Sequence, residues 1–357
     1  MNTTLDLSEL DERIGQLFVA GMPGPSLDEG TESLIREGNL GGVILFARNI
    51  QDPLQLADLC RGLQERAMDC RGLPLFLAVD QEGGRVARLR RPFTEFPGNA
   101  AIGADAEPEQ RAVEFARTTA LEMGVVGLNM DLAPVLDVQR GTLEKHLSGR
   151  SFGEAPELVA LLGTRVIRTL QENGVMAVAK HFPGLGRATL DPHVSLPRID
   201  LDEEELEAVN LPPFRAAIEA GVAGIMSSHA LYPILDAERP ATLSSPVLTG
   251  LLRERMAFQG ILITDDLEMG AIAGNRTAAQ GAVEAFEAGA DILLICANQE
   301  EVRAGIVAIR GKLLRGEIPF RRLTEAHGRI MKAKAGFLAG KGEISLGRVK
   351  DYFRLVG

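Results

Sequence analysis

Eight short segments of this chain are almost continuously apolar, and longer stretches of mixed composition separate them. Strands that are buried on both faces of a parallel sheet have this continuous pattern, whereas half-exposed strands alternate between apolar and polar residues. We therefore expect eight buried strands, at residues 16–22, 41–47, 74–80, 129–138, 175–182, 223–230, 260–266 and 290–296.

The stretches between the apolar segments have the periodicity of helices. Apolar side chains recur every three or four positions in residues 107–123 and again in residues 299–315. Gly174, Gly221 and Gly289 follow helical segments, at positions where glycine commonly ends a helix. Strands that alternate with helices indicate a parallel sheet. Eight such units predict an α/β protein with a (β/α)8 barrel. An open doubly wound sheet is the alternative, but no GxGxxG motif follows the first strand.

The length of the chain allows more than a minimal barrel. Its 357 residues exceed the roughly 250–300 residues at which a single core usually stops growing. We expect one barrel domain over residues 1–357, with its core at about 13–340. Residues 317–357 read as a short helical extension with a polar tail. A barrel with a small second domain is the alternative.

The formal net charge of −11 is unfavourable for binding nucleic acid or an anionic membrane surface. Cys60, Cys70 and Cys296 lack metal-ligand spacing, and we expect them to be reduced thiols. No signal peptide or apolar membrane span is visible in the sequence. These features predict a soluble, cytoplasmic, monomeric protein with no nucleic-acid or membrane partner.

Polar and charged residues gather where the expected strands end. In a parallel barrel the carboxyl ends of all strands meet at one face, which is the face that carries active sites. Charges there cost desolvation free energy unless they have partners or a function. Helix capping alone does not explain lysine and histidine beside carboxylates, so we expect one shared polar pocket. The strand-end residues are Asn49, Asp80, Gln81, Glu82, Asp137, Lys180, His181, His229, Asp265 and Asp266.

The residue types narrow the chemistry of this pocket. The sequence contains no HExxH or CxxC motif, which would indicate a metal site. It also contains no GxSxG motif, which would indicate a serine nucleophile. Carboxylates with histidines and cations suit glycoside hydrolysis, in which one carboxylate attacks and a second group transfers the proton. Aldolases and isomerases share the barrel, so these residue types alone leave the reaction open.

Five motifs together resemble glycoside hydrolase family 3. In chain order they read AVDQEGGRVARL, APVLDV, GRSFG, KHFPGLG…DPH and GILITDDLEMG. The resemblance extends from about residue 13 to 340. It is closest to the single-domain β-N-acetylglucosaminidases of bacterial cell-wall recycling. It implies a hydrolase that needs no metal or cofactor and acts on a small carbohydrate or muropeptide.

The resemblance also implies roles for individual residues. Asp265 matches the nucleophile, and His193 with Asp191 matches an acid/base dyad on a loop. A carboxylate nucleophile implies retention of configuration through a covalent intermediate. The implied product is terminal N-acetylglucosamine, released from muropeptides or related β-glycosides. Residues implied to bind the sugar are Asp80, Arg88, Arg150, Lys180 and His181.

The loop that carries the dyad departs from the family pattern. Leu185 stands between two glycines where the family usually has histidine, Arg187 follows, and Pro192 separates the dyad residues. Pro192 predicts a stiffer loop. We expect Arg187 to lie near the mouth of the pocket and to favour an acidic leaving group. A β-N-acetylglucosaminide phosphorylase and a catalytically weak sugar-binding protein remain alternatives, and we expect His229 to be structural.

Overall fold

The computed structural model describes residues 7–141, 145, 147–274, 276–340 and 342–355. Residues 1–6, on which part of the signal-peptide expectation rests, lie outside this set. Within it, eight parallel strands are hydrogen-bonded in the order β10-β1-β2-β3-β6-β7-β8-β9. A bridge between Ile263 and Ile292 joins the two ends of this order, so the sheet closes into a (β/α)8 barrel as predicted. The strands are β1 (Phe18–Gly21), β2 (Gly42–Leu45), β3 (Phe76–Val79), β6 (Met130–Asp131), β7 (Met176–Phe182), β8 (Gly224–Ser227), β9 (Ile261–Thr264) and β10 (Leu293–Ile295).

Each of the eight predicted segments contains one of these strands, but one is much shorter than predicted. The strand expected at residues 129–138 is reduced to β6, which pairs over Met130 and Asp131. Pro134 has no backbone N–H, so it cannot donate to a sheet ladder. The chain regains only an isolated bridge, between Val135 and Lys180.

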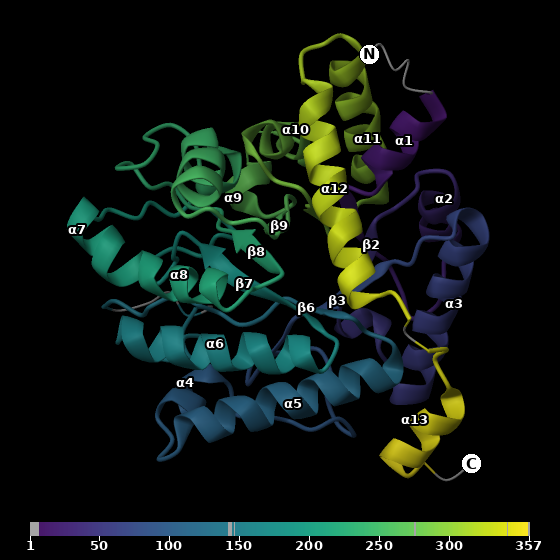
Figure 1. The fold of residues 1–357 in the computed structure, drawn as a ribbon, viewed down its shortest axis with the longest axis horizontal. Coiled ribbons are helices and arrows are strands. Elements are labelled where there is room, and N and C mark those ends of the chain that lie inside the picture. Colours follow the sequence, from purple (N-terminus) through teal and green to yellow (C-terminus); the bar gives the residue numbers. More distant parts are fainter. Residues whose placement is uncertain (1–6, 142–144, 146, 275, 341, 356–357) are drawn as a thin grey trace.

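Helices surround the barrel on its outer face (Figure 1). The helices expected at residues 107–123 and 299–315 are present as α5 and α11. Gly174, Gly221 and Gly289 have positive φ angles where helices end, which a residue with a Cβ rarely adopts. The longer outer helices are α2 (Glu29–Arg36), α3 (Pro53–Arg71), α5 (Pro108–Val126), α6 (Pro156–Glu172), α8 (Leu211–Glu219), η4 (Pro246–Arg255), α10 (Ala278–Ala288), α11 (Gln299–Leu314) and α12 (Phe320–Phe337).

The remaining helical elements complete the described chain. They are α1 (Leu7–Gly15), η1 (Ala47–Asn49), α4 (Asn99–Gly103), α7 (Glu203–Glu205), η2 (Leu206–Asn210), η3 (Ala241–Leu243), α9 (Gly270–Ala273) and α13 (Leu346–Phe353). An antiparallel hairpin of β4 (Gln81–Gly83) and β5 (Val86–Ala87) follows β3 directly. This hairpin projects from the end of the barrel at which the expected site residues lie.

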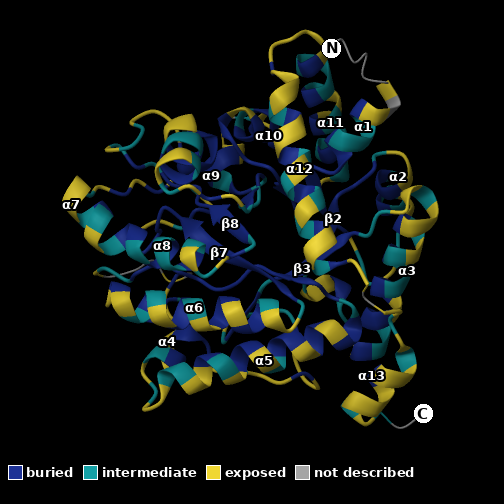
Figure 2. Ribbon diagram, viewed as in Figure 1, coloured by how far each residue is buried: buried dark blue, intermediate teal, exposed yellow. Residues whose placement is uncertain are grey.

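The core lies between the strands and the inward faces of the helices. Every residue of the eight barrel strands is buried, whereas the outer helices have both buried and exposed residues (Figure 2). Each fully buried Val, Leu, Ile or Phe side chain contributes about 1.5–3 kcal/mol to the free energy of folding.

Among the described helices, none is both long and apolar enough to cross a membrane.

The C-terminal extension contains a second helix that the sequence analysis did not predict. After α12, the described residues of the expected polar tail include α13, which packs against α3 and α5. Val349 is fully buried, and the ring of Phe353 lies edge-on to Phe93 with centroids 4.8 Å apart. The apolar residues of α13 are few, but they fall on one face of the helix.

Candidate active site

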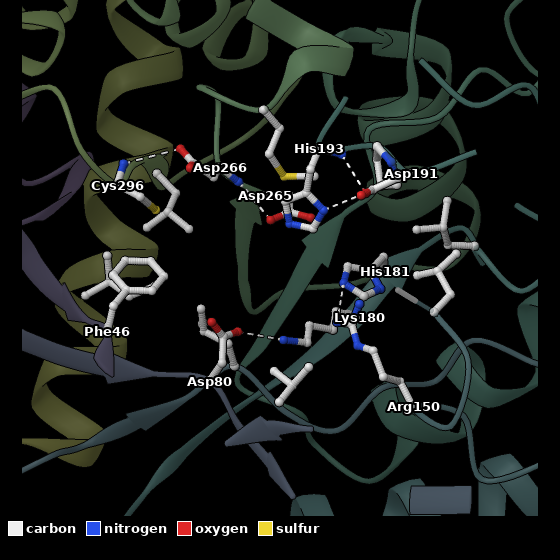
Figure 3. Close-up of a pocket in the computed structure, with 18 of the residues that line it drawn as sticks. Phe46, Asp80, Arg150, Lys180, His181, Asp191, His193, Asp265, Asp266 and Cys296 are labelled. Carbon is white, nitrogen blue, oxygen red and sulfur yellow. Dashed lines mark hydrogen bonds and ion pairs between the residues drawn. The ribbon is translucent and has the colours of Figure 1, made fainter. Parts of the chain in front are cut away.

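A cavity of about 380 Å³ opens at the carboxyl ends of the barrel strands (Figure 3). All eight residues that the sequence analysis assigned to catalysis or sugar binding line it. The lining therefore unites side chains that are up to 185 positions apart, from residue 80 to residue 265. These eight are Asp80, Arg88, Arg150, Lys180, His181, Asp191, His193 and Asp265.

Lys180, on β7, is the centre of a buried ionic network. Its Nζ lies 2.8 Å from Asp80 Oδ1 and 2.7 Å from Glu82 Oε1, and its side chain is 2% exposed. Asp80 also accepts a hydrogen bond of 2.9 Å from Arg88 Nη2. Burial on its own would lower the pKa of Lys180, but the charges of Asp80 and Glu82 outweigh burial and raise it. Lys180 therefore stays an ammonium group.

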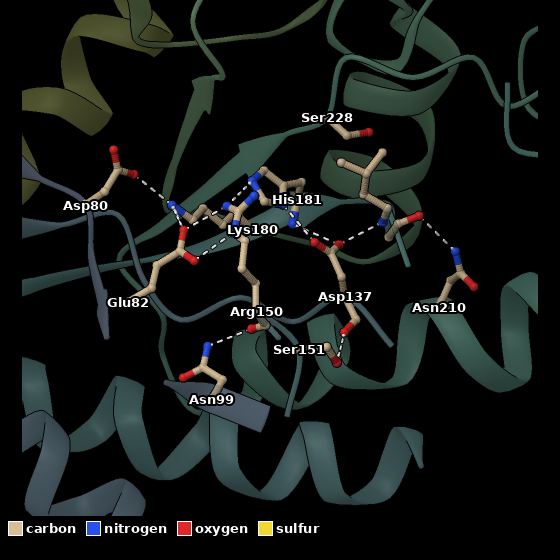
Figure 4. Close-up of polar contacts among 12 residues, drawn as sticks. Asp80, Glu82, Asn99, Asp137, Arg150, Ser151, Lys180, His181, Asn210 and Ser228 are labelled. Atoms are coloured by element: carbon tan, nitrogen blue, oxygen red, sulfur yellow. Dashed lines mark hydrogen bonds and ion pairs between the residues drawn. The ribbon is translucent and has the colours of Figure 1, made fainter. Parts of the chain in front are cut away.

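Glu82 connects this lysine to Arg150. The two side chains form a bidentate pair, with Nε to Oε2 and Nη2 to Oε1 both at 2.8 Å (Figure 4). Burial would raise the pKa of Glu82, but Arg150 and Lys180 lower it to about 2. With Asp80 and Arg88, the network contains three cations and two carboxylates, which leaves one net positive charge in an acidic protein.

Asp137 holds His181 in a defined orientation. Its Oδ2 lies 2.7 Å from His181 Nδ1, and its Oδ1 accepts the backbone N–H groups of His181 at 3.1 Å and Leu185 at 2.7 Å. Burial opposes ionisation of Asp137, but His181 and these N–H groups lower its pKa. An ionised Asp137 accepts a hydrogen bond from a protonated Nδ1, and Nε2 of His181 lies 3.4 Å from Arg150 Nη2.

Asp265 and Asp266 follow β9, and both line the cavity. β9 ends at Thr264, so the alternation of side chains along a strand does not extend to these two residues. The two carboxylates nevertheless differ. Asp266 Oδ1 accepts the N–H groups of Glu268 at 3.1 Å and Cys296 at 3.3 Å, and burial raises its pKa to about 6. In Figure 3 Asp266 lies beside Cys296, whereas Asp265 lies on the side of His193.

The loop with Asp191 and His193 is docked against the segment that follows Asp265. His193 Nδ1 lies 2.7 Å from Asp191 Oδ1, which also accepts the His193 backbone N–H at 2.9 Å. The N–H of Gly270 donates to the His193 carbonyl at 3.0 Å, and that of Ala271 to the Pro192 carbonyl at 3.1 Å. These contacts hold both dyad residues at the cavity.

A glycine is required where this loop docks. A Cβ on Gly270 would lie 2.5 Å from the Val194 carbonyl oxygen and 2.8 Å from that of His193, well inside van der Waals contact. The sequence motif that contains Asp265 therefore ends in a residue that positions the partner loop.

The structure assigns the unusual loop residues different places. Leu185 is buried and lines the cavity. Arg187 is not among the residues that line the cavity. Its guanidinium instead pairs with both carboxylate oxygens of Glu205, at 2.6 and 2.7 Å.

His229 has the structural role that we expected. It is buried, with Nδ1 2.8 Å from Thr242 Oγ1 and Nε2 2.9 Å from the Asp266 carbonyl oxygen. Burial lowers its pKa, which is consistent with a neutral ring that hydrogen-bonds through both nitrogens.

Some residues of the site had no role in the sequence analysis. Glu82 and Asp137 were recognised only as strand-end carboxylates, and Arg85 was not singled out. Glu82 and Arg85 both stand in the motif that contains Asp80 and Arg88, so the hairpin motif was the available signal. In the described part of the chain, no group of three or more His, Cys, Asp or Glu side chains could hold a metal ion.

The family model for the glycosyl hydrolase family 3 N-terminal domain matches residues 9–333. The chain therefore belongs to glycoside hydrolase family 3, and the barrel with its strand-end cavity is that of a glycoside hydrolase.

Individual relatives agree with this class. The chain is 38% identical to beta-hexosaminidase A of Pseudoalteromonas piscicida over 288 residues, which are 76% of this chain and 47% of that protein. It thus spans about half the length of that relative. It is 36% identical to a beta-hexosaminidase of Alkalilimnicola ehrlichii over 296 residues, 82% of this chain and 83% of the relative.

Solved structures extend the comparison. A family 3 β-N-acetylglucosaminidase from Paenibacillus matches with a TM-score of 0.90 and 37% identity, over 96% of this chain and 67% of that one. NagZ from Neisseria gonorrhoeae, solved with N-trifluoroacetyl-D-glucosamine, matches with a TM-score of 0.75 and 29% identity, over 93% of this chain and 98% of that one.

Proposed function

We propose that this chain is a retaining, exo-acting β-N-acetylglucosaminidase. It would release terminal N-acetylglucosamine from muropeptides or related β-glycosides. The observation that carries the proposal is the docking of the Asp191–His193 loop beside Asp265 at one cavity. Similarity to proteins named beta-hexosaminidase and β-N-acetylglucosaminidase supports this substrate class.

In the proposed first step, a carboxylate oxygen of Asp265 forms a bond to the anomeric carbon of the sugar. The glycosidic carbon–oxygen bond breaks, and His193 donates its Nε2 proton to the departing oxygen. Asp191, 2.7 Å from Nδ1, would fix the tautomer and stabilise the imidazolium. In the second step His193 takes a proton from water, whose oxygen replaces Asp265 at the anomeric carbon.

The ionic network would bind the sugar. Asp80 accepts hydrogen bonds from ring hydroxyls, whereas Arg88, Arg150 and Lys180 donate them. These groups already have charged partners, so their positions are fixed before the ligand arrives. Asp137 holds the Nδ1 of His181, and its Nε2 lies 3.4 Å from Arg150 Nη2, so His181 is fixed next to the same network.

Hydrolysis of p-nitrophenyl N-acetyl-β-glucosaminide, compared with the matching β-glucoside, tests the proposal. We expect kcat/KM for the N-acetyl substrate to be higher by at least about tenfold, as for a substrate group with its own contacts. Equal rates for the two would exclude N-acetylglucosamine specificity.

A phosphorylase is the second candidate, because the network carries a net positive charge and the proposed acid/base is not an anion that repels phosphate. Rates with and without phosphate separate the two reactions, and sugar-1-phosphate is the diagnostic product. Sugar binding without turnover would instead support the weak binding protein that Leu185 suggested.

A further inference from the structure

Arg85, on the turn of the hairpin after β3, lines the cavity without having been assigned a role. We propose that Arg85 recognises a carboxylate on the leaving group and so determines specificity beyond the sugar. The inference rests on the proposed glycosidase function, because it concerns the part of the substrate that this reaction expels.

The exposure of the cavity-lining residues places Arg85 at the opening of the cavity. Among the cavity-lining residues, all of which the structure describes, Arg85 and His193 are the two that are exposed. They therefore mark where the cavity opens to solvent. His193 is the proposed proton donor to the departing oxygen, so the leaving group extends from His193 towards the opening. Arg85 is the cation at that opening.

The turn that presents Arg85 is fixed by its backbone. Gly83 and Gly84 have φ angles of 84° and 59°, and a Cβ on Gly84 would lie 2.8 Å from the Pro97 carbonyl oxygen. Arg85 Nη1 also donates to the Lys145 carbonyl at 2.8 Å. The guanidinium is thus positioned before a ligand binds.

Arg85 also differs from the other arginines nearby in its partners. No carboxylate in the described ranges forms an ion pair with Arg85. The guanidinium of Arg85 has five N–H donors, and the Lys145 carbonyl accepts from only one of them. The neighbouring arginines of the segment each have a carboxylate partner: Arg88 pairs with Asp80, and Arg90 and Arg91 share Glu95. Arg187 on the opposite loop is neutralised by Glu205.

The ligand chemistry follows from this contrast. A guanidinium with unused donors matches the planar, bidentate geometry of a carboxylate. The net charge of −11 works against an anionic leaving group, and a local cation at the opening offsets that repulsion.

Two matched substrates test the proposal: 3-carboxyphenyl and 3-carbamoylphenyl N-acetyl-β-glucosaminide. They share shape and sugar and differ in one charge. In Arg85→Gln, we expect the ratio of kcat/KM for the acid to kcat/KM for the amide to fall about tenfold, as for one charged hydrogen bond. Arg85→Lys should restore part of the ratio. Raising the salt concentration should lower the wild-type ratio.

Arg187→Gln is the control, because it removes a neutralised arginine from the neighbouring loop. It should leave the ratio unchanged. An unchanged ratio in Arg85→Gln, or an equal fall in Arg187→Gln, would overturn the proposal. A purely structural role for Arg85 would lower both rates together.

A binding measurement separates this inference from the proposed function. Calorimetry with the two corresponding 1-thioglycosides needs no turnover. Wild type should bind the acid more tightly than the amide, and Arg85→Gln should lose that preference. Equal affinities in wild type contradict the role of Arg85, whereas failure to hydrolyse the amide O-glycoside contradicts the glycosidase proposal.

Discussion

Each end of the barrel buries a lysine, and the two lysines have opposite electrostatic environments. Lys180, at the carboxyl ends of the strands, is 2% exposed and has carboxylates at 2.7 and 2.8 Å. Lys334, on α12, is 3% exposed, and its Nζ donates to the Gln16 amide oxygen at 2.6 Å and lies 5.2 Å from the centre of the Phe76 ring. The pKa of Lys180 is raised, whereas burial lowers that of Lys334 to about 7.

The difference shows that burial alone does not decide the charge of a lysine. Gln16 precedes β1 and Phe76 begins β3, so Lys334 closes the amino-terminal end of the barrel. That end of a (β/α)8 barrel contributes to stability, whereas the other end carries function. The carboxylate partners of Lys180 keep it charged, so its ammonium group can bind a ligand. The single amide partner of Lys334 does not stabilise the charged form in this way.

The largest effect should come from Lys180→Met. It leaves Asp80 and Glu82 with one cation fewer in a buried site, and losing one partner of a buried pair costs about 3–5 kcal/mol. We expect kcat/KM to fall by more than about 10³-fold because the sugar-binding network collapses. Urea unfolding and steady-state kinetics measure the two losses. Full activity in this variant would show that Lys180 has no functional role at the carboxyl ends of the strands.

Gly270→Ala should have an intermediate effect. The added Cβ pushes on the carbonyls of His193 and Val194, so the dyad moves away from Asp265. We expect kcat to fall about 10–100-fold with little change in KM, as for a small misplacement of a catalytic group. Gly124→Ala is the control, because a Cβ there meets no atom within 4 Å. An equal loss in both variants would refute the positioning role.

Lys334→Met should have the smallest effect on activity and a gain in stability. The folded-state pKa of about 7 lies below the unfolded value of about 10.4, so the unfolded state binds more protons between these pH values. Wild-type stability therefore rises with pH across this window, and the methionine variant lacks that rise.

The gain from Lys334→Met should be largest below about pH 7 and should shrink by roughly 4 kcal/mol between pH 7 and 10. Thermal unfolding from pH 6 to 10 measures it, with kcat/KM expected to stay at the wild-type level. A gain that is constant with pH would show that Lys334 is not buried with a lowered pKa.

The same contrast explains what the sequence could predict. Continuous apolar runs located all eight strands, and the strand-end rule brought distant residues such as Asp80 and Asp265 to one cavity. Pro134 could be read from the sequence, but its effect on the length of β6 could not. That effect depends on which backbone N–H groups donate to the neighbouring strands.

Pairings between side chains could not be read from the sequence. The sequence did not show that the Arg187 guanidinium pairs with Glu205. It also did not show that Arg85 forms no ion pair with a carboxylate of the described residues. Likewise, the residues around Lys334 in the sequence do not predict that its side chain is buried against Gln16. Such outcomes depend on the distances between segments after folding.

In the proposed mechanism, Asp265 attacks the sugar while His193 transfers the proton. Intact-mass spectrometry after incubation with a slowly hydrolysed fluorinated N-acetylglucosaminide tests it most directly. We predict one added glycosyl group, located by peptide mapping on Asp265, and no adduct in Asp265→Asn. An adduct on another residue, or steady turnover by Asp265→Asn, would contradict the account.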